Sequence, residues 1–284
     1  MQKTTDAVTA SAYSSTRNEM PTNQPNNAVI DRKPTRSELR KSRERFLRPR
    51  KAEIAYQRQL TAVAKQVGSI IQGFAPDGVV TDMPALRASL LRYAEVLRPW
   101  ARTVTATMHG SVAKRDAIAW NRLSREMGRT LRKEIATAPI GQALREAMAI
   151  QVKLITSLPV EAAERVHKLT TEGIINATRA DEIAKEIMRS GSVTASRAQL
   201  IARTEVARTS SLLVESRARH IGSSHYIWRT VLDGRVRKEH RRLEGKVIAW
   251  DDPPIAGEDG MRYHAGQGPR CRCFSEPIIP ETVK

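Results

Sequence analysis

The chain has 284 residues, enough for one large domain or two ordinary ones. Hydrophobic residues make up 40% and aromatic residues only 4%, which predicts a modest core with extended parts. The formal net charge of +18 predicts attraction to polyanions such as nucleic acid, or docking onto an acidic protein surface. No apolar run approaches the roughly 20 residues that span a bilayer, so we expect no membrane protein.

Residues 1–34 are rich in Thr, Ser, Asn, Gln and Pro and show no periodicity, so they are predicted to form a disordered tail. The first residues lack the apolar stretch of a secretion signal. We therefore expect the protein in a reducing cytoplasm. There the two cysteines would stay reduced.

A basic block follows the tail. Its members are Arg36, Arg40, Lys41, Arg43, Arg45, Arg48, Arg50 and Lys51. Clustered Lys and Arg side chains displace counterions from a nucleic-acid backbone, so the block is a candidate arm that contacts phosphates. The alternative is the solvated face of the first helix. The sequence supports both interpretations equally.

Residues 35–158 are predicted to form a basic helical arm or bundle. Apolar residues recur at helical spacing over 52–71, until the breakers that begin at Gly73. Asp82 is a candidate N-cap for a helix over 84–97, which Pro99 interrupts before a further helix over 100–108. Another helix is predicted over 111–137, and a last one that runs up to Pro159. The Trp and Met residues on these stripes are expected in the core.

Residues 159–222 are predicted to form a block of shorter helices. One begins at Pro159 and ends near Gly173. Residues 178–181 and 196–199 resemble capping boxes, which predicts helices over 181–188 and 197–220. The second of these helices carries Arg203 and Glu205, which are either surface residues or a buried structural network that joins the helices to the last module.

Residues 223–284 are predicted to form a small α+β module. Alternating residues predict strands over 226–231, 246–250 and 272–275. Asp233 and Gly234 indicate a turn, and a short helix over 235–243 follows. A loop rich in Gly and Pro separates the last two strands. The predicted fold class is therefore a mainly α N-terminal region with a small α+β C-terminal module.

The module contains a candidate zinc site made of His240, His264, Cys271 and Cys273. Thiolates and imidazoles are the usual ligands of structural zinc, and a loop with few apolar anchors would gain stability from a metal. The Cys-x-Cys spacing is shorter than in most zinc sites. The alternative is that both cysteines pack as small buried side chains and His240 donates to a backbone carbonyl. A disulfide between residues two apart is not expected.

Catalysis is a weaker alternative. Cys271 with either histidine can form a thiolate pair, and Asp233, Glu239 and His240 can form a metal-assisted hydrolytic site. The sequence contains no P-loop, GxSxG, HExxH or dinucleotide-binding fingerprint. We therefore expect a protein that is not an enzyme.

Several stretches together resemble the phage Mu F-like minor head protein family of phage head morphogenesis. They are I-A-R-T-E at 201–205, W-R-T-V-L-D-G-R-V-R-K-E-H at 228–240, L-E-G-K at 243–246 and C-R-C at 271–273. The resemblance covers roughly residues 160–280. The sequence departs from the family at Arg270, where an Asn is common, and at Glu239–His240, where a Cys or His pair often occurs.

The resemblance implies a head-morphogenesis-like domain over 159–284 and a minor capsid protein of a tailed phage. It implies partners in the portal or major capsid protein and in packaged double-stranded DNA. It places the protein in the head interior or near the portal, and in the host cytoplasm during assembly. Two other functions stay open, a metal-dependent nuclease or hydrolase that uses the Cys/His cluster, and a DNA-binding protein without a role in the virion.

Overall fold

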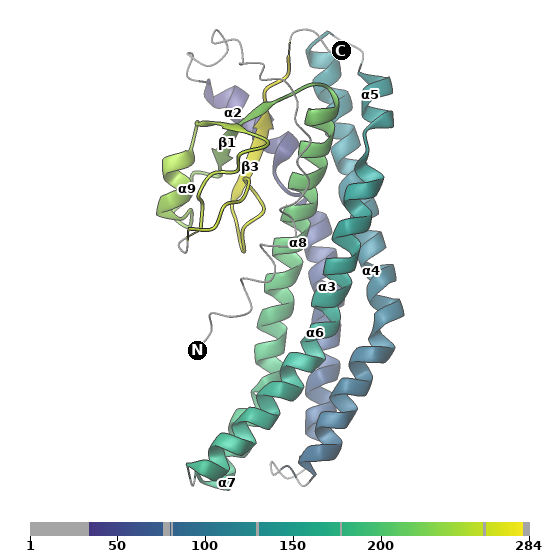
Figure 1. Cartoon of the computed structure of the whole chain (residues 1–284), viewed down its shortest axis with the longest axis vertical. Helices are drawn as coiled ribbons and strands as arrows, with labels where there is room; N and C mark the ends of the chain where they lie inside the picture. The colour runs from purple at the N-terminus through teal and green to yellow at the C-terminus, as the bar shows by residue number, and fades with distance from the viewer. Residues whose placement is uncertain are drawn as a thin grey trace. The chain divides into compact units, whose positions relative to one another are not determined.

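A computed structural model describes residues 34–75, 80, 82–128, 131–176, 178–257 and 260–280 (Figure 1). The predicted disordered tail, except Pro34, lies outside the described residues. The described chain is helical as far as His220 and ends in a small antiparallel sheet, which confirms the predicted fold class. No helix in this part of the chain has the length and apolarity needed to cross a membrane.

Seven helices precede the sheet in the described residues. They are α2 (Arg36–Phe46), α3 (Arg50–Gly73), α4 (Met83–Glu126), α5 (Arg132–Thr137), α6 (Ile140–Ile175), α7 (Ala180–Met188) and α8 (Ser190–His220). The module that follows contains β1 (His225–Thr230), α9 (Lys238–Leu243), β2 (Val247–Ala249) and β3 (Cys273–Pro277).

The predicted helix breaks at two prolines are wrong. Pro99 lies inside α4, and Pro159 lies inside α6. A proline within a helix loses one hydrogen bond and crowds a carbonyl, at a cost of about 3 kcal/mol. Buried residues on both sides of Pro99, such as Leu97 and Ala101, continue one apolar stripe. Burial of that stripe outweighs the local cost.

A helix end was missed between residues 111 and 137. Helix α4 ends at Glu126, and Gly128 adopts a left-handed φ of 64° that glycine accepts without strain. The chain then turns into α5, where the Leu131 N–H donates to the Ser124 hydroxyl at 3.0 Å. The predicted continuous helix is therefore two helices.

The helix starts also differ from those expected. Helix α7 has Arg179 as its N-cap, without a side-chain capping bond, and α8 begins at Ser190, so Ser196 lies inside it. The N-cap role of Asp82 is confirmed, since its carboxylate accepts from the Ala85 N–H at 2.9 Å. A capping box that the sequence analysis missed joins Thr35 and Glu38 at the start of α2.

The chain divides into two compact units, each built from separate segments. The sheet unit comprises the described residues of 34–48, 116–140 and 210–280, and the helical unit those of 49–115 and 141–209. The predicted domains are continuous segments that meet after residue 158, whereas each unit combines separate segments. The predicted boundary stays a prediction.

The sheet unit is built around three antiparallel strands in the order β2-β1-β3. Tyr226 pairs with Ile248 on one side of β1, and Trp228 pairs with Ser275 on the other. The three predicted strands are confirmed with ends shifted by one or two residues. Helix α2 packs near β3, and Phe46 from α2 joins the same core as the strand aromatics.

The helical unit has a separate apolar core. One cluster of buried residues comes from α3, α4, α6 and α7 and comprises Val67, Ile71, Leu86, Leu90, Ala162, Ala163, Val166 and Ile187. Helices α3 and α8 meet at two glycines. A Cβ on Gly191 would lie 3.2 Å from the Gly68 Cα, so the two backbones approach closely there.

Candidate metal centre

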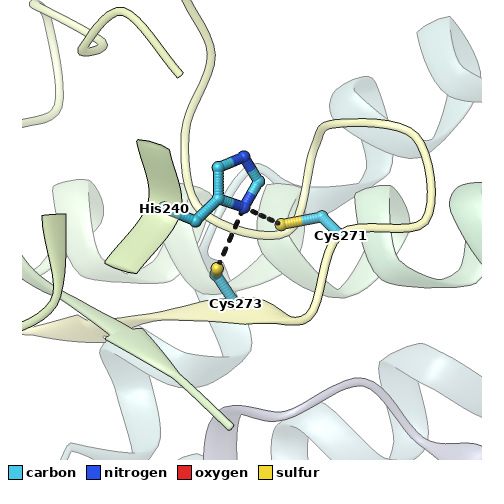
Figure 2. Close-up of side chains that lie close together, drawn as sticks. All are labelled: His240, Cys271 and Cys273. Atoms are coloured by element: carbon cyan, nitrogen blue, oxygen red, sulfur yellow. Dashed lines mark hydrogen bonds between the residues drawn. The ribbon is translucent and has the colours of Figure 1, made fainter. Parts of the chain in front are cut away.

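Three of the four predicted metal ligands lie together in the sheet unit (Figure 2). His240 Nδ1 lies 3.3 Å from Cys273 Sγ and 3.6 Å from Cys271 Sγ. The ligand atoms of these residues all lie within 4.8 Å of one another. Among the described residues they are the one group of three or more His, Cys, Asp or Glu side chains that can hold a metal ion.

Local structure brings the group together. Helix α9 buries His240 and Leu243 on one side, and the imidazole packs edge-on against the Trp228 ring of β1. Arg270, with a left-handed φ of 53°, precedes Cys271, and Cys273 begins β3. Both sulfurs thereby point toward the same ring nitrogen, and no disulfide joins them.

The far side of the His240 ring is fixed by hydrogen bonds. Its Nε2 lies 3.1 Å from the Ala256 carbonyl and 3.2 Å from the Tyr263 hydroxyl, which itself donates to Ala256. A carbonyl accepts only, so we assign the proton to Nε2. The Nδ1 lone pair is then left facing the two sulfurs. Metal-bound histidines commonly have this arrangement.

The two thiols are strongly coupled. The hydrogen bond from Cys273 lowers the pKa of Cys271 well below its usual value, although burial opposes the shift. The same hydrogen bond raises the pKa of Cys273. One thiol therefore readily loses its proton, and a divalent metal would displace the second proton as well.

The buried indole N–H of Trp228 is a suitable hydrogen-bond donor for a deprotonated Cys273. The Trp228 indole N–H has no hydrogen-bond partner at normal distance among the described residues, although it acts to lower the pKa of Cys273. We take the contact to be a weak one, because sulfur accepts poorly while it is protonated. A metal-bound thiolate would be a better acceptor for this N–H. The residues present therefore fit a bound metal.

The fourth predicted ligand, His264, lies apart from this group. Its Nδ1 accepts from the Tyr226 hydroxyl at 3.2 Å, and its ring packs against Tyr226 and Trp250. Burial lowers the pKa of His264 to about 4, and the positive charge of Arg219 contributes. His264 is thus a neutral core residue in this structure.

The hydrolytic combination that involves Asp233 is not assembled either. Its carboxylate is engaged by Arg272 and by the Arg235 backbone N–H, in a network described below. Glu239 is half-buried on α9 and does not belong to the group of potential ligands. The thiolate pair of Cys271 with His240 is the one catalytic alternative that the geometry brings together.

Glu205, from the predicted structural network, is buried in the helical unit. Its carboxylate accepts from Gln151 at 3.2 Å and from Arg208 at 3.1 Å, and burial raises its pKa. Gln151 also contacts His109 Nε2 at 2.7 Å, so the network links α4, α6 and α8. Arg203 is half-buried in the same helix. Gln151 was not predicted as part of this network. A polar residue on the apolar stripe of a helix would have indicated it.

The residues of the basic block differ in their exposure to solvent. Arg36, Arg40, Lys41 and Arg43 are exposed on α2, Arg50 and Lys51 are exposed at the start of α3, and Arg48 is half-buried. Arg45 forms an ion pair with Glu126, which takes it away from the free surface. Phosphate binding by the block stays a prediction.

Comparison with known proteins identifies one family. Residues 164–276 match the profile described as phage Mu protein F like protein. An uncharacterized protein of Haemophilus influenzae (strain ATCC 51907 / DSM 11121 / KW20 / Rd) is 25% identical over 259 residues, with 84% of this chain covered. The chain spans 57% of the length of that relative. No solved structure matches the chain significantly.

The matched segment extends from α6 to β3 and includes α9 and all three residues of the metal-ligand group. It also includes the I-A-R-T-E and C-R-C stretches. The segment 164–276 is therefore similar to the phage Mu protein F like family.

Proposed function

We propose that this protein is a minor head protein of a tailed phage, a structural component that contacts the portal, the capsid interior and packaged DNA. The observation that carries this proposal is the family match over 164–276, because phage Mu F-like proteins act in head morphogenesis. The formal charge of +18 suits a protein that works beside packaged phosphates.

We further propose that His240, Cys271 and Cys273 bind a zinc ion with a structural role. Two thiolates and one imidazole are ligands that zinc prefers. The three side chains are 1%, 2% and 4% exposed. Burial of this degree favours a structural metal over a catalytic one, since a catalytic metal needs a position that substrate can reach.

The zinc would stabilise the small sheet by joining α9 to β3 and to the loop before it. Its charge would be balanced by the two thiolates, and the Ala256 carbonyl would keep the His240 ring oriented. The burial that favours a structural metal argues equally against a nuclease or hydrolase that uses the same residues.

The function is tested on the particles themselves. Phage heads produced by the bacterium that carries this gene are purified on a density gradient and digested for mass spectrometry. Peptides of this chain are expected in the heads at low copy, and absent from heads of a strain in which the gene is deleted. Expression of the chain without its incorporation into heads would contradict the proposal.

A further inference from the structure

Helix α9 carries a second feature besides His240. It has six residues, and His240 and Leu243 form its buried side. Lys238, Arg241 and Arg242 are all exposed. Their i, i+3, i+4 spacing places them together on the opposite side of the helix. The three exposed side chains of α9 are therefore all cationic, and the one acidic residue of the helix, Glu239, is half-buried.

The residues that flank α9 extend this charge. Arg235 precedes the helix and Lys246 follows it, and both are exposed. Residues 235–246 contain six basic and two acidic side chains, a net charge of +4. One of the two acids, Glu244, accepts from the Thr230 N–H and pairs with Arg229 on its other oxygen.

Little of this charge is neutralised locally. Within the described part of the chain, Lys238, Arg242 and Lys246 have no ion-pair partner. The Arg241 guanidinium donates to two backbone carbonyls, of Asp233 and Gly234, which leaves its full charge in place.

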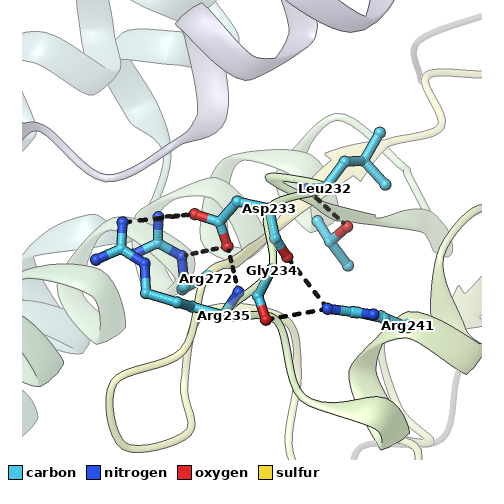
Figure 3. A network of polar contacts seen from close by, with 7 residues as sticks. Leu232, Asp233, Gly234, Arg235, Arg241 and Arg272 are labelled. Carbon is cyan, nitrogen blue, oxygen red and sulfur yellow. Dashed lines mark hydrogen bonds and ion pairs between the residues drawn. The ribbon is translucent and has the colours of Figure 1, made fainter.

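The turn beside α9 is held in a fixed conformation, as Figure 3 shows. Arg272 pairs with both oxygens of Asp233, and the Arg235 N–H donates to one of them at 3.1 Å. Arg241 binds the carbonyl side of the same turn at 3.1 Å from Gly234. Leu232, at its start, has a φ of 55°, which is costly for a leucine and is maintained by its surroundings.

Because the turn beside these basic side chains is already fixed, its backbone loses little conformational entropy on binding. We propose that the α9 surface, formed by Arg235, Lys238, Arg241, Arg242 and Lys246, binds the phosphate backbone of double-stranded DNA. This inference rests on the proposed function, which places the protein beside packaged DNA. The surface is separate in sequence from the basic block at 36–51.

The composition of the surface favours DNA over an acidic protein. Phosphates are bound by charge and N–H donors alone, and all five side chains supply both. Protein interfaces instead depend on buried aromatic or apolar anchors, and the five residues of the α9 surface include none. The expected binding is independent of base sequence and strongly dependent on salt.

The test compares the wild-type chain with two triple variants of equal charge change. Lys238→Gln/Arg242→Gln/Lys246→Gln removes three of the five charges of the α9 surface without touching the residues that fix the turn. The control, Arg58→Gln/Lys65→Gln/Arg87→Gln, removes three exposed charges from the helical unit. Binding to a labelled duplex of about 30 base pairs is measured by fluorescence anisotropy over a salt series.

The α9 variant is expected to bind about tenfold or more weakly, and its slope of log K against log salt should fall by about 2 to 3. The control variant should bind as the wild type does.

Unchanged binding by the α9 variant, or an equal loss in the control, overturns the inference and leaves the head-protein proposal standing. Tighter capture of polyglutamate than of the duplex overturns it in favour of an acidic protein partner. A wild type that binds no DNA removes both this inference and the DNA contact of the proposed function, while incorporation into heads is decided separately.

Discussion

The two units of this protein bury polar side chains for different purposes. The sheet unit buries two coupled thiols and an imidazole, together with an Asp116–Arg217 ion pair. The helical unit buries a hydrogen-bonded set centred on Gln151. The thiols contact His240 Nδ1 and would gain ligand bonds from a metal, whereas the helical set is satisfied by its own members. Under the proposed zinc site, the sheet unit would gain stability from a ligand and the helical unit would not.

The largest expected effect comes from removal of the metal ligands. Cys271→Ser/Cys273→Ser should abolish zinc binding and destabilise the metal-bound sheet unit by on the order of 10 kcal/mol, since metal binding is coupled to folding. Tryptophan fluorescence should report the loss, because Trp228 and Trp250 lie in the same core. Far-ultraviolet circular dichroism should show that most helix is retained.

A matched pair of histidine variants sharpens this result. His240→Gln should lose the metal, whereas His264→Gln should retain it, since His264 lies with Tyr226 and Trp250 and not with the sulfurs. Equal metal loss in both variants would show that His264 is a ligand after all. Metal content after dialysis is the measurement.

The second effect concerns the buried ion pair of the sheet unit. Arg217 Nε donates to the Asp116 carboxylate at 2.5 Å, and burial raises the pKa of Asp116 to about 6 although Arg217 opposes the shift. Asp116→Ala should destabilise the protein by about 3 to 5 kcal/mol, because it leaves a buried guanidinium unpaired. Urea unfolding measures the change. The double variant Asp116→Ala/Arg217→Met should regain much of it, and no recovery would show that the pair is not the cause.

The third effect is a dependence on pH. The pKa of His264 is lowered to about 4 from an unfolded value near 6.5, so the unfolded chain binds its proton first as pH falls. Stability from this residue is complete above pH 6.5 and is lost as pH falls toward 4, by about 3 kcal/mol. His264→Gln should flatten that part of the curve. A variant with the same acid dependence as the wild type would exclude His264 as the source.

The smallest effect belongs to the helical unit. Gln151→Leu should cost about 2 kcal/mol, because His109 and Glu205 lose a buried partner. Gln142→Leu, at an exposed position of the same helix, is the control and should be near neutral. The free energy of unfolding of each variant is measured by chemical denaturation in the presence of zinc, so that the metal content is the same in all samples. A loss as large as that of the cysteine variants would contradict the contrast between the units.

The sequence predicted the three strands better than the long helices. Strands at 226–231 and 246–250 are bounded by a turn and a loop, so their local signals agree with the fold. In the helical unit, Pro99 and Pro159 are strong local breakers, but packing along both helices overrides them. Local rules cannot weigh that packing energy.

For the site, residue type and spacing selected His240, His264, Cys271 and Cys273, of which the structure brings together His240, Cys271 and Cys273. They could not separate His240 from His264, because the choice depends on the path of the loop between β2 and β3. The cationic side of α9 was also missed. The spacing of Lys238, Arg241 and Arg242 indicates this cationic side, but only when the boundaries of the helix are known.

The most direct test of the account is the metal content of the purified, folded chain, measured by mass spectrometry of the element with X-ray absorption at the zinc edge. The account predicts about one four-coordinate zinc ion per chain, with two sulfur ligands and one imidazole from this chain. A fully folded sheet unit that is free of metal, even after refolding with excess zinc, would contradict it.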